Sequence, residues 1–388
     1  MPSVNSSPLD SAALVAPDAF GLYVHVPYCA RACPYCDFDF RVDPRPDGGV
    51  LLEALQREVL GRDDARLGQS PHTIYIGGGT PSVLNADDLG ALLQWISSTW
   101  STQTCVEWTV ECNPEHIDPA RLESLRRAGV HRISLGVQSF DAVGLRQLGR
   151  AHDPDQACEA VEAAQLLGLA VSVDLIVGWP GQTTDGLRAE LQHVMSLGAS
   201  HVSVYALTIE PGTPWERLAE RGVRRLPQVD DAADALECCS AVLGDAGFVH
   251  YEVASYARGT SFAVHNTGYW LGRDYVGVGP SAASARHHEG GVTRRSNPRG
   301  ADWWAGKGAS AEVLDSESAA REALWLSLRL LEGVEIDAFL RRVHRDRAWL
   351  DARTLRARAR GNVTLDGGRM RVAAGRWMHH DDIAADVL

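Results

Sequence analysis

The chain has 388 residues, of which 45% are hydrophobic and 22% charged, and its formal net charge is −13. This composition is ordinary for a globular protein with a substantial core. The negative charge argues against a general nucleic-acid surface, which needs a basic field. The basic residues are one lysine, Lys307, and arginines spread along the chain, so we interpret them as compositional bias. No run of about 18 apolar residues occurs, so we expect no transmembrane segment.

The first residues predict neither a signal peptide nor a folded element. Residues 1–14 have no basic segment and only a short apolar run, so we expect a disordered tail. A cytoplasmic location follows from this expectation, and thiols stay reduced in that compartment. Clustered cysteines therefore indicate a metal or redox site rather than a disulfide framework.

Residues 15–245 alternate short apolar β-type runs with helical stretches. The expected strands are 22–26, 73–76, 106–111, 132–137, 171–178 and 201–207. Strands that alternate with helices predict an α/β fold with a parallel sheet. Six such units without a change of pattern favour a barrel or partial barrel over a flat, doubly wound sheet.

Two further regions follow this core. Residues 246–315 contain two β segments, "FVHYEVASYA" (248–257) and "SARHHEGGVTRRSN" (284–297), and the second predicts a hairpin that turns at Gly290–Gly291. Residues 316–388 combine helical stretches with a small β pair in "NVTLDGGRMRVAA" (362–374). This pattern predicts a small C-terminal α/β domain of the winged-helix type.

Three cysteines fall close together in "GLYVHVPYCARACPYCDFDF" (21–40). Cys29, Cys33 and Cys36 have the spacing C-x3-C-x2-C. A structural zinc site needs four ligands, and no second CxxC or CxxH pair lies nearby. A [4Fe–4S] cluster on three cysteines leaves one iron open for a small molecule, which would explain the odd number. A zinc site and three unrelated buried thiols are the alternatives.

Glycines and polar side chains follow successive strands at the end where parallel barrels bind ligands. The run "GGGTP" (77–81) comes after the second strand, and glycines there let the backbone approach a ligand closely. The polar residues at the ends of later strands are Glu111, Asn113, Gln138, Arg150, His152 and Asp174. Any one of them has a simpler explanation as a turn or a core residue, but together they predict a ligand site at this edge.

The stretches "YVHVPYCARACPYC", "GGGTPS", "SLGVQSFD" and "DLIVGWPGQT" resemble the radical S-adenosylmethionine (SAM) superfamily. More closely, the chain resembles the HemN/HemW group related to oxygen-independent coproporphyrinogen III oxidase, from about residue 20 to the end. The resemblance implies a (β/α)6 TIM-like partial barrel with a [4Fe–4S] cluster on the three cysteines. It also implies that SAM chelates the open iron, and that an electron donor reduces the cluster so that SAM is cleaved to a 5′-deoxyadenosyl radical.

The same resemblance implies a set of SAM-binding residues. Two tyrosines would flank the cluster and SAM, a glycine-threonine run would meet the amino end of SAM, and four polar side chains would hold its polar groups. In that order these residues are Tyr23 and Tyr35; Gly78, Gly79 and Thr80; and Glu111, Gln138, Arg150 and Asp174.

Two features separate the members of this group. The oxidase resembles C-x3-C-x2-C-x-C, with a longer arm before the motif, whereas this chain has Phe38 at the last position. HemW-type proteins, regarded as haem chaperones that pass haem to apo-haemoproteins, resemble the chain at Phe38 and in "HNTGYW" (265–270). The resemblance therefore implies a haem chaperone. The alternative is the oxidase itself, which decarboxylates coproporphyrinogen III in porphyrin biosynthesis.

His265 is the predicted haem ligand, because neutral imidazole is a common axial ligand. The alternative is that HNTGYW is a turn with packed aromatic rings and that His265 only forms hydrogen bonds. The histidines of "HYE" (250–252) and "RHH" (286–288) are rival ligands. We expect the extension that carries HNTGYW to close over the barrel mouth. The remaining cysteines, expected to be small core residues, are Cys105, Cys112, Cys158, Cys238 and Cys239.

Overall fold

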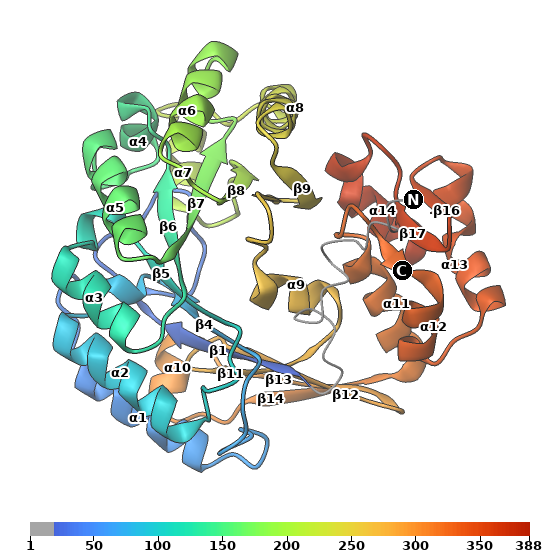
Figure 1. The fold of residues 1–388 in the computed structure, drawn as a ribbon, viewed down its shortest axis with the longest axis horizontal. Coiled ribbons are helices and arrows are strands. Elements are labelled where there is room, and N and C mark those ends of the chain that lie inside the picture. The colour runs from blue at the N-terminus through green and yellow to red at the C-terminus, as the bar shows by residue number, and fades with distance from the viewer. Residues whose placement is uncertain (1–18) are drawn as a thin grey trace, which may run out of the picture.

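The computed structural model describes residues 19–388, so the predicted tail, 1–14, lies outside the described residues. A twelve-stranded sheet organises the fold, in the order β14-β13-β12-β11-β1-β4-β5-β6-β7-β8-β10-β9. Its six central strands run parallel and are β1 (Phe20–Val26), β4 (Thr73–Gly78), β5 (Glu107–Cys112), β6 (Arg132–Gln138), β7 (Ala170–Val177) and β8 (His201–Ala206). They curve into an open half-barrel with helices on its outer side (Figure 1). The predicted α/β partial barrel is confirmed.

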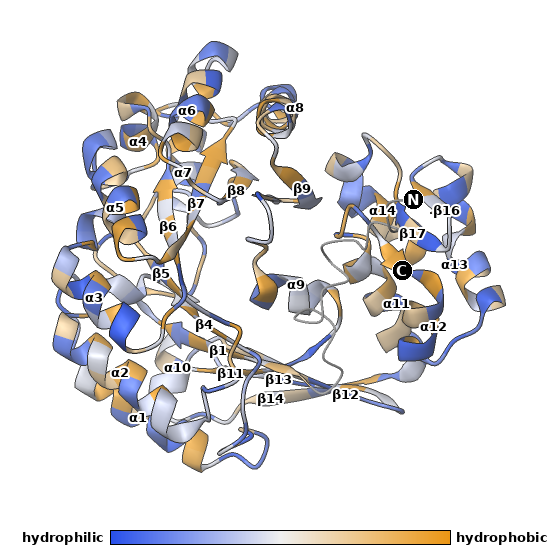
Figure 2. Ribbon diagram, viewed as in Figure 1, coloured by the Kyte–Doolittle hydropathy of each residue, from blue (hydrophilic) through white to orange (hydrophobic). Residues whose placement is uncertain are grey.

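Helices return the chain from each parallel strand to the next. They are α1 (Gly48–Leu60), α2 (Ala86–Thr99), α3 (Pro119–Arg127), α4 (Ala142–Gln147), α5 (Pro154–Leu166) and α6 (Thr184–Ser196). Each begins after an Asp, Asn or Thr whose side chain accepts a backbone N–H of the first turn. Their apolar stripes cover the outer face of the sheet, and the hydrophobic residues concentrate along this contact (Figure 2).

The next segment extends both edges of the half-barrel. After α7 (Pro214–Glu220) and α8 (Val229–Asp245), the strands β9 (Val249–Glu252) and β10 (Ser255–Ala257) add to the β8 edge. The chain then passes through α9 (Val264–Trp270), and β11 (Asp274–Val278) joins the other edge, parallel to β1. The strands β12 (Ala283–His288), β13 (Gly291–Ser296) and β14 (Ser310–Asp315) continue the sheet, with α10 (Gly300–Trp304) before the last. The hairpin at Gly290–Gly291 is confirmed, whereas β11 and β14 were not expected as strands.

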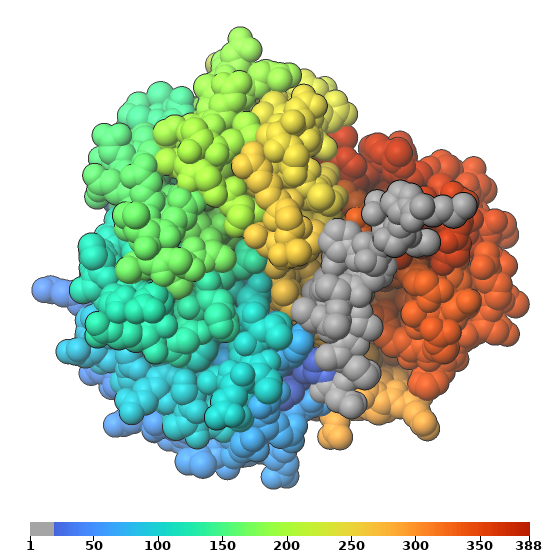
Figure 3. Space-filling view, viewed as in Figure 1, coloured from blue at the N-terminus to red at the C-terminus, as the bar shows by residue number. Residues whose placement is uncertain are grey.

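The C-terminal residues form a lobe on one side of the barrel (Figure 3). Its elements are α11 (Ser316–Ser327), β15 (Val334–Glu335), α12 (Ile336–Val343), α13 (Arg347–Ala359), β16 (Val363–Asp366), β17 (Arg369–Val372) and α14 (His380–Val387). The first six follow the helix–strand–helix–helix–strand–strand order of a winged helix, and the lobe has an apolar core of its own. The domain boundaries stay predictions. Within residues 19–388, no helix is both long and apolar enough to span a membrane.

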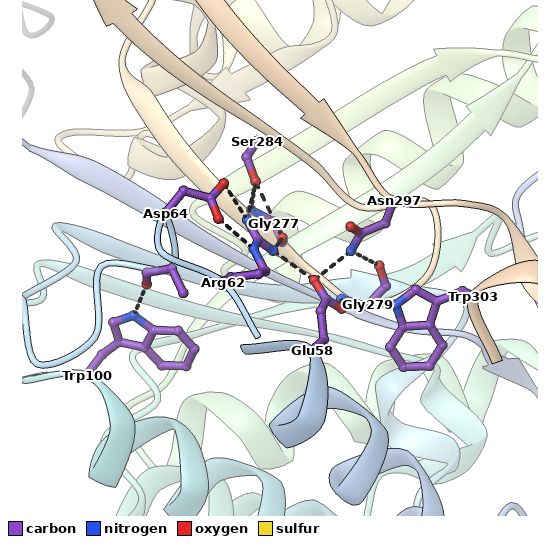
Figure 4. Close-up of polar contacts among 10 residues, drawn as sticks. Glu58, Arg62, Asp64, Trp100, Gly277, Gly279, Ser284, Asn297 and Trp303 are labelled. Atoms are coloured by element: carbon purple, nitrogen blue, oxygen red, sulfur yellow. Dashed lines mark hydrogen bonds and ion pairs between the residues drawn. The ribbon is translucent and has the colours of Figure 1, made fainter. Parts of the chain in front are cut away.

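A buried polar network fixes the extension to the barrel (Figure 4). Arg62, which follows α1, has a side chain that is 1% exposed and pairs with Glu58 at 2.7 Å. Its guanidinium also donates to the carbonyl of Gly277 at 2.7 Å and to Ser284 Oγ at 3.1 Å. The Glu58 carboxylate accepts in turn from the Asn297 amide at 2.7 Å. These contacts join α1 to β11, β12 and the end of β13, so this edge of the sheet is held by more than its strand pairing.

Candidate metal centre

The three cysteines predicted to hold a cluster lie in the loop that follows β1. Two short parallel strands, β2 (Tyr28–Cys29) and β3 (Arg41–Val42), bring the two ends of this loop together. Within it, the backbone N–H of Cys36 donates to the carbonyl of Cys33 at 3.2 Å, which turns the chain between these thiols. All three cysteines are free and partly buried. The loop therefore presents them at the carboxyl end of β1, where the sequence places a ligand site.

The chemistry of these thiols fits a cluster better than a single ion. Burial raises the pKa of Cys29 and of Cys36 to about 11, so the bare thiols keep their protons at neutral pH, and a metal centre would displace them. Within residues 19–388, no three His, Cys, Asp or Glu side chains converge on one point where an ion could bind. A zinc ion requires such convergence, whereas in a [4Fe–4S] cluster each cysteine binds a different iron.

Two residues predicted to contact SAM, Thr80 and Arg150, form hydrogen bonds to the cysteine sulfurs. The hydroxyl of Thr80 donates to Cys29 Sγ at 3.5 Å, and Arg150 Nη1 donates to Cys33 Sγ at 3.3 Å. The other terminal nitrogen of Arg150 donates to Asn113 Oδ1 and to the carbonyl of Gly136, both at 2.7 Å. Hydrogen bonds of this kind to sulfur tune the reduction potential of an iron–sulfur cluster. Arg150 therefore ties the cysteine loop to the ends of β5 and β6.

Three polar side chains pack closely against a glycine on β6. A Cβ built on Gly136 would lie 3.0 Å from Gln138 Nε2, 3.2 Å from Asn113 Oδ1 and 3.4 Å from Arg150 Nη2. Gln138 itself has a φ of +69°, a strained backbone for a residue other than glycine. Strain of this kind collects at ligand sites. The predicted residues Gln138 and Arg150 are thus brought together, and sequence reasoning missed Gly136, whose only signal is its place two residues before Gln138.

The glycine run at the end of β4 allows this strand to pack closely against neighbouring parts of the chain. Gly78 has a φ of +109°, and its added Cβ would lie 2.6 Å from the ring of His25. An added Cβ on Gly79 would lie 2.4 Å from the carbonyl oxygen of Tyr28, which precedes the first cysteine. The backbone N–H of Thr80 donates to that same oxygen at 2.6 Å. Glycine at these positions lets the end of β4 pack directly on the cysteine loop.

Two carboxylates, Glu111 on β5 and Asp174 on β7, are partly buried on neighbouring parts of the sheet. Glu111 accepts from the Tyr75 hydroxyl at 2.7 Å and from the backbone N–H of Gly78 at 3.2 Å. Burial nevertheless raises its pKa to about 7, and the charge of Asp174 adds to this effect. Burial also raises the pKa of Asp174 to about 6, although Ser134 donates to it at 2.7 Å. The pair is a partly buried negative site that a cationic ligand would stabilise.

The two predicted tyrosines occupy different parts of the site. The Tyr23 hydroxyl bonds to His25 Nδ1 at 3.0 Å, and its ring stacks on that of Tyr75, with 6.2 Å between centroids. Tyr35 lies beside Cys33, and burial together with the charge of that cysteine raises the pKa of Tyr35 well above its usual range. Tyr35 therefore lies beside the cysteines, whereas Tyr23 lies on the Glu111 side of the site.

A carboxylate–histidine pair lies behind Arg150, and of its two residues the sequence predicts only His152 as part of the site. His152 Nε2 donates to the carbonyl of Val137 at 3.0 Å, and its Nδ1 lies 3.1 Å from Glu115 Oε2. Burial opposes the ionisation of Glu115, but the hydrogen bond from His152 and the charge of Arg150 lower its pKa to about 2. The "NPE" and "GRAH" stretches carry these residues, and only the fold shows that they meet.

His265 lies at the opposite end of the sheet from the cysteines. Its ring nitrogens are both engaged, with Thr73 Oγ1 and the Tyr269 hydroxyl each at 2.8 Å, and the residue is 3% exposed. Its backbone N–H donates to Glu107 at 2.8 Å. Since Thr73 and Glu107 begin β4 and β5, α9 crosses the amino ends of the strands. The expectation that the extension closes over the barrel mouth is therefore wrong for the segment that carries HNTGYW, although Ser281 and Gly300 of the same extension bond to Asp39 of the cysteine loop. With both nitrogens engaged, this geometry favours the structural alternative for His265 over a haem ligand.

The rival histidines differ in their surroundings. His250 is stacked on Tyr256, with 4.1 Å between ring centroids, and burial lowers its pKa to about 4. His287 and His288 lie on the exposed end of β12. His288 Nε2 contacts the hydroxyl of Thr293 at 3.2 Å. The contacts of His287 leave its Nε2 without a partner among residues 19–388.

The remaining cysteines are core residues, as expected. Cys112, Cys238 and Cys239 are buried in the main apolar cluster. Cys105 and Cys158 are partly buried and pack against it.

Comparisons with known proteins agree with this geometry. Residues 23–194 match the family model described as the radical SAM superfamily. The heme chaperone HemW of Mycobacterium tuberculosis is 37% identical over 341 residues, which are 85% of this chain and 86% of that protein. HemW of Escherichia coli is 36% identical over 291 residues, 72% of this chain and 74% of that protein.

The solved structure of coproporphyrinogen III oxidase (HemN) from Escherichia coli, a radical SAM enzyme, superposes with a TM-score of 0.80. It covers 97% of this chain and 92% of its own at 22% identity, so this likeness shows the fold alone. Family membership rests instead on the similarity to HemW proteins, which exceeds 30% identity across most of both chains. The chain belongs to the radical SAM superfamily and, within it, to the HemW family.

Proposed function

We propose that this protein is a haem chaperone, which binds haem and passes it to apo-haemoproteins. The observation that carries the proposal is the similarity to proteins named heme chaperone HemW along more than four-fifths of the chain. Phe38 supports it, because the oxidase pattern places a cysteine at this position. Phe38 is 66% exposed on the cysteine loop, so its ring is not required by the core.

We further propose that Cys29, Cys33 and Cys36 hold a [4Fe–4S] cluster and that SAM binds beside it. Thr80 and Arg150 would stabilise the cysteine sulfurs through the hydrogen bonds described above. When bound and reduced by one electron, this pair of cofactors supplies a 5′-deoxyadenosyl radical.

The chain's own residues supply binding and orientation at this site. Glu111 and Asp174 provide negative charge for the ammonium or the ribose hydroxyls of SAM. The amide of Gln138 and the guanidinium of Arg150 converge beside Gly136, where they can orient a carboxylate. Held in fixed hydrogen bonds, these groups are positioned before a ligand arrives. The electron donor and the cytoplasmic location stay predictions.

The cluster assignment is tested by Cys33→Ser, with Cys158→Ser as the matched control outside the loop. After anaerobic reconstitution, we expect Cys33→Ser to lose the visible absorption of the cluster and most of its bound iron, and the control to keep both. Circular dichroism confirms that both variants fold. A full cluster spectrum in Cys33→Ser would refute the ligand assignment.

Turnover separates the chaperone from the oxidase. The reconstituted protein receives SAM, a reductant and coproporphyrinogen III, and mass spectrometry detects any protoporphyrinogen formed. We expect no product from protein that has an intact cluster and binds haem stoichiometrically. Product formed over many turnovers would establish the oxidase and overturn the chaperone proposal.

A further inference from the structure

A large cavity opens far from the cysteine loop, between the extension and the C-terminal lobe. Its volume is about 1420 Å³, which is ample for a tetrapyrrole. Ala19, just before β1, the turn between β12 and β13, and the helices α11 and α12 all contribute to its wall. Figure 1 shows α11 and α12 standing beside the ends of these strands. An ion pair between Arg294 on β13 and Glu322 on α11 joins the two sides.

The charge of this cavity suits an anionic ligand. Seven arginines and five carboxylates line it, in a chain whose net charge is −13. Three of the carboxylates are already neutralised by arginines: Asp64 by Arg62, Asp274 by Arg66 and Glu335 by Arg341.

Arg273 and Arg342 are among the arginines of this cavity that have no ion pair within residues 19–388. Burial lowers the pKa of Arg273 to about 10, and its Nη2 is buried without a hydrogen-bond partner among these residues. Arg342 lines the same cavity and is exposed to solvent. Two uncompensated guanidinium groups in one cavity are arranged to receive carboxylates.

His287, on the same wall, has the hydrogen bonds of a metal-binding imidazole. Its Nδ1 lies 3.0 Å from Asp274 Oδ1, and its backbone N–H donates to the same oxygen at 2.8 Å. An acceptor at Nδ1 fixes the tautomer and leaves the lone pair of Nε2 available, which is the usual arrangement of histidine ligands to metals. No residue within 19–388 bonds to His287 Nε2, in contrast to His265, where both nitrogens are engaged.

The histidine and an unpaired arginine approach each other across the cavity. A Cβ built on Gly272 would lie 3.5 Å from Cζ of Arg342 and 3.7 Å from Nε2 of His287. Apolar side chains from both lobes, Leu271 and Phe339 among them, also line the space. An iron ligand, carboxylate-binding cations and an apolar surface are the three features that an iron porphyrin with two propionates requires.

We propose that this cavity is the haem-binding site, with His287 as the axial ligand to iron and Arg273 and Arg342 as the partners of the propionates. The inference rests on the proposed chaperone function. The His287 side chain is 37% exposed, so the cavity holds its ligand at an open edge from which an acceptor can take it. β1 runs from this cavity to the cysteine loop over seven residues, roughly 20 Å. Haem bound here is therefore cargo, out of reach of a radical formed at the cluster.

Ferric haem titration tests the site by the position and intensity of the Soret band, which reports the axial ligand independently of any activity. We expect His287→Ala to change this spectrum and to weaken binding by about tenfold or more. His288→Ala, one residue along β12, and His265→Gln are the matched controls and should keep both spectrum and affinity. Arg342→Gln should weaken binding by about tenfold without changing the spectrum, whereas Arg347→Gln on α13 should not.

Metal-free protoporphyrin IX isolates the role of the arginines. Its binding should fall in Arg342→Gln and stay unchanged in His287→Ala, because no iron is present to need a ligand. If the natural chain binds haem and both His287→Ala and Arg342→Gln match it in spectrum and affinity, the site assignment is wrong and the chaperone proposal stands. If the natural chain binds no haem, the chaperone proposal itself fails.

Discussion

Replacing Glu111 by glutamine should stabilise the cofactor-free protein, and more so at high pH. The folded state raises the pKa of this carboxyl from 4.5 to about 7, so folding takes up a proton between these values. Stability is therefore lost as the pH rises from 4.5 to 7, and stays low above that range. Each pKa unit corresponds to about 1.4 kcal/mol. The raised pKa of Glu111 therefore lowers the free energy of unfolding by about 3 kcal/mol at pH 8 and by about 1 kcal/mol at pH 5.

Glutamine keeps an oxygen that can accept from the Tyr75 hydroxyl but carries no charge. Relative to the natural chain, Glu111→Gln should gain about 2–3 kcal/mol in the free energy of unfolding between pH 5 and pH 8. Urea unfolding of the cofactor-free protein in reductant, followed by tryptophan fluorescence, measures this difference. Glu53→Gln, on the exposed side of α1, is the matched control. An equal effect of Glu111→Gln at both pH values would refute the reasoning that this carboxylate awaits a cation.

Three further substitutions test the packing of the fold. Gly79→Ala places a Cβ 2.4 Å from a backbone oxygen and should lower stability by about 2–3 kcal/mol, whereas Gly90→Ala, with free space in α2, should raise the melting temperature. Arg62→Leu leaves the Glu58 carboxylate unpaired and should cost about 3–5 kcal/mol in urea unfolding; an unchanged midpoint would contradict the role of the network. His265→Gln should lower stability by about 1–3 kcal/mol yet keep haem affinity, and a large loss of affinity would restore it as a ligand.

The barrel and the cysteine loop were predictable because their signals are local. Each parallel strand is a short apolar run ended by polar residues or glycine, so the ends of six strands could be placed within two residues of those observed. The three cysteines lie within eight residues of one another, and their spacing alone limits the kinds of metal centre that they can bind. The hairpin was marked by Gly290–Gly291 between two β-type runs.

The rest depends on contacts between distant segments. β11 is a five-residue strand whose partner, β1, precedes it by about 250 residues, and no local pattern reports that pairing. The same reason hides the carboxylate–histidine pair of Glu115 and His152, and the convergence of polar groups over Gly136. HNTGYW was wrongly expected at the barrel mouth, because a sequence motif does not report where in the fold it lies. Only the hydrogen bonds of His265 with Thr73 and Glu107 place this motif at the amino ends of the strands.

The late arrival of β11 also has a consequence for synthesis. β1 leaves the ribosome about 250 residues before β11, which begins at Asp274, and the cysteine loop follows β1 directly. At 5–20 residues per second, roughly 12–50 s pass before one edge of β1 finds its partner. During this interval β1 is an exposed sheet edge, and the loop beside it is anchored on one side only. A nascent chain that ends before β11 should thus keep its thiols open to oxidation, so metal loading is best timed after the extension has emerged.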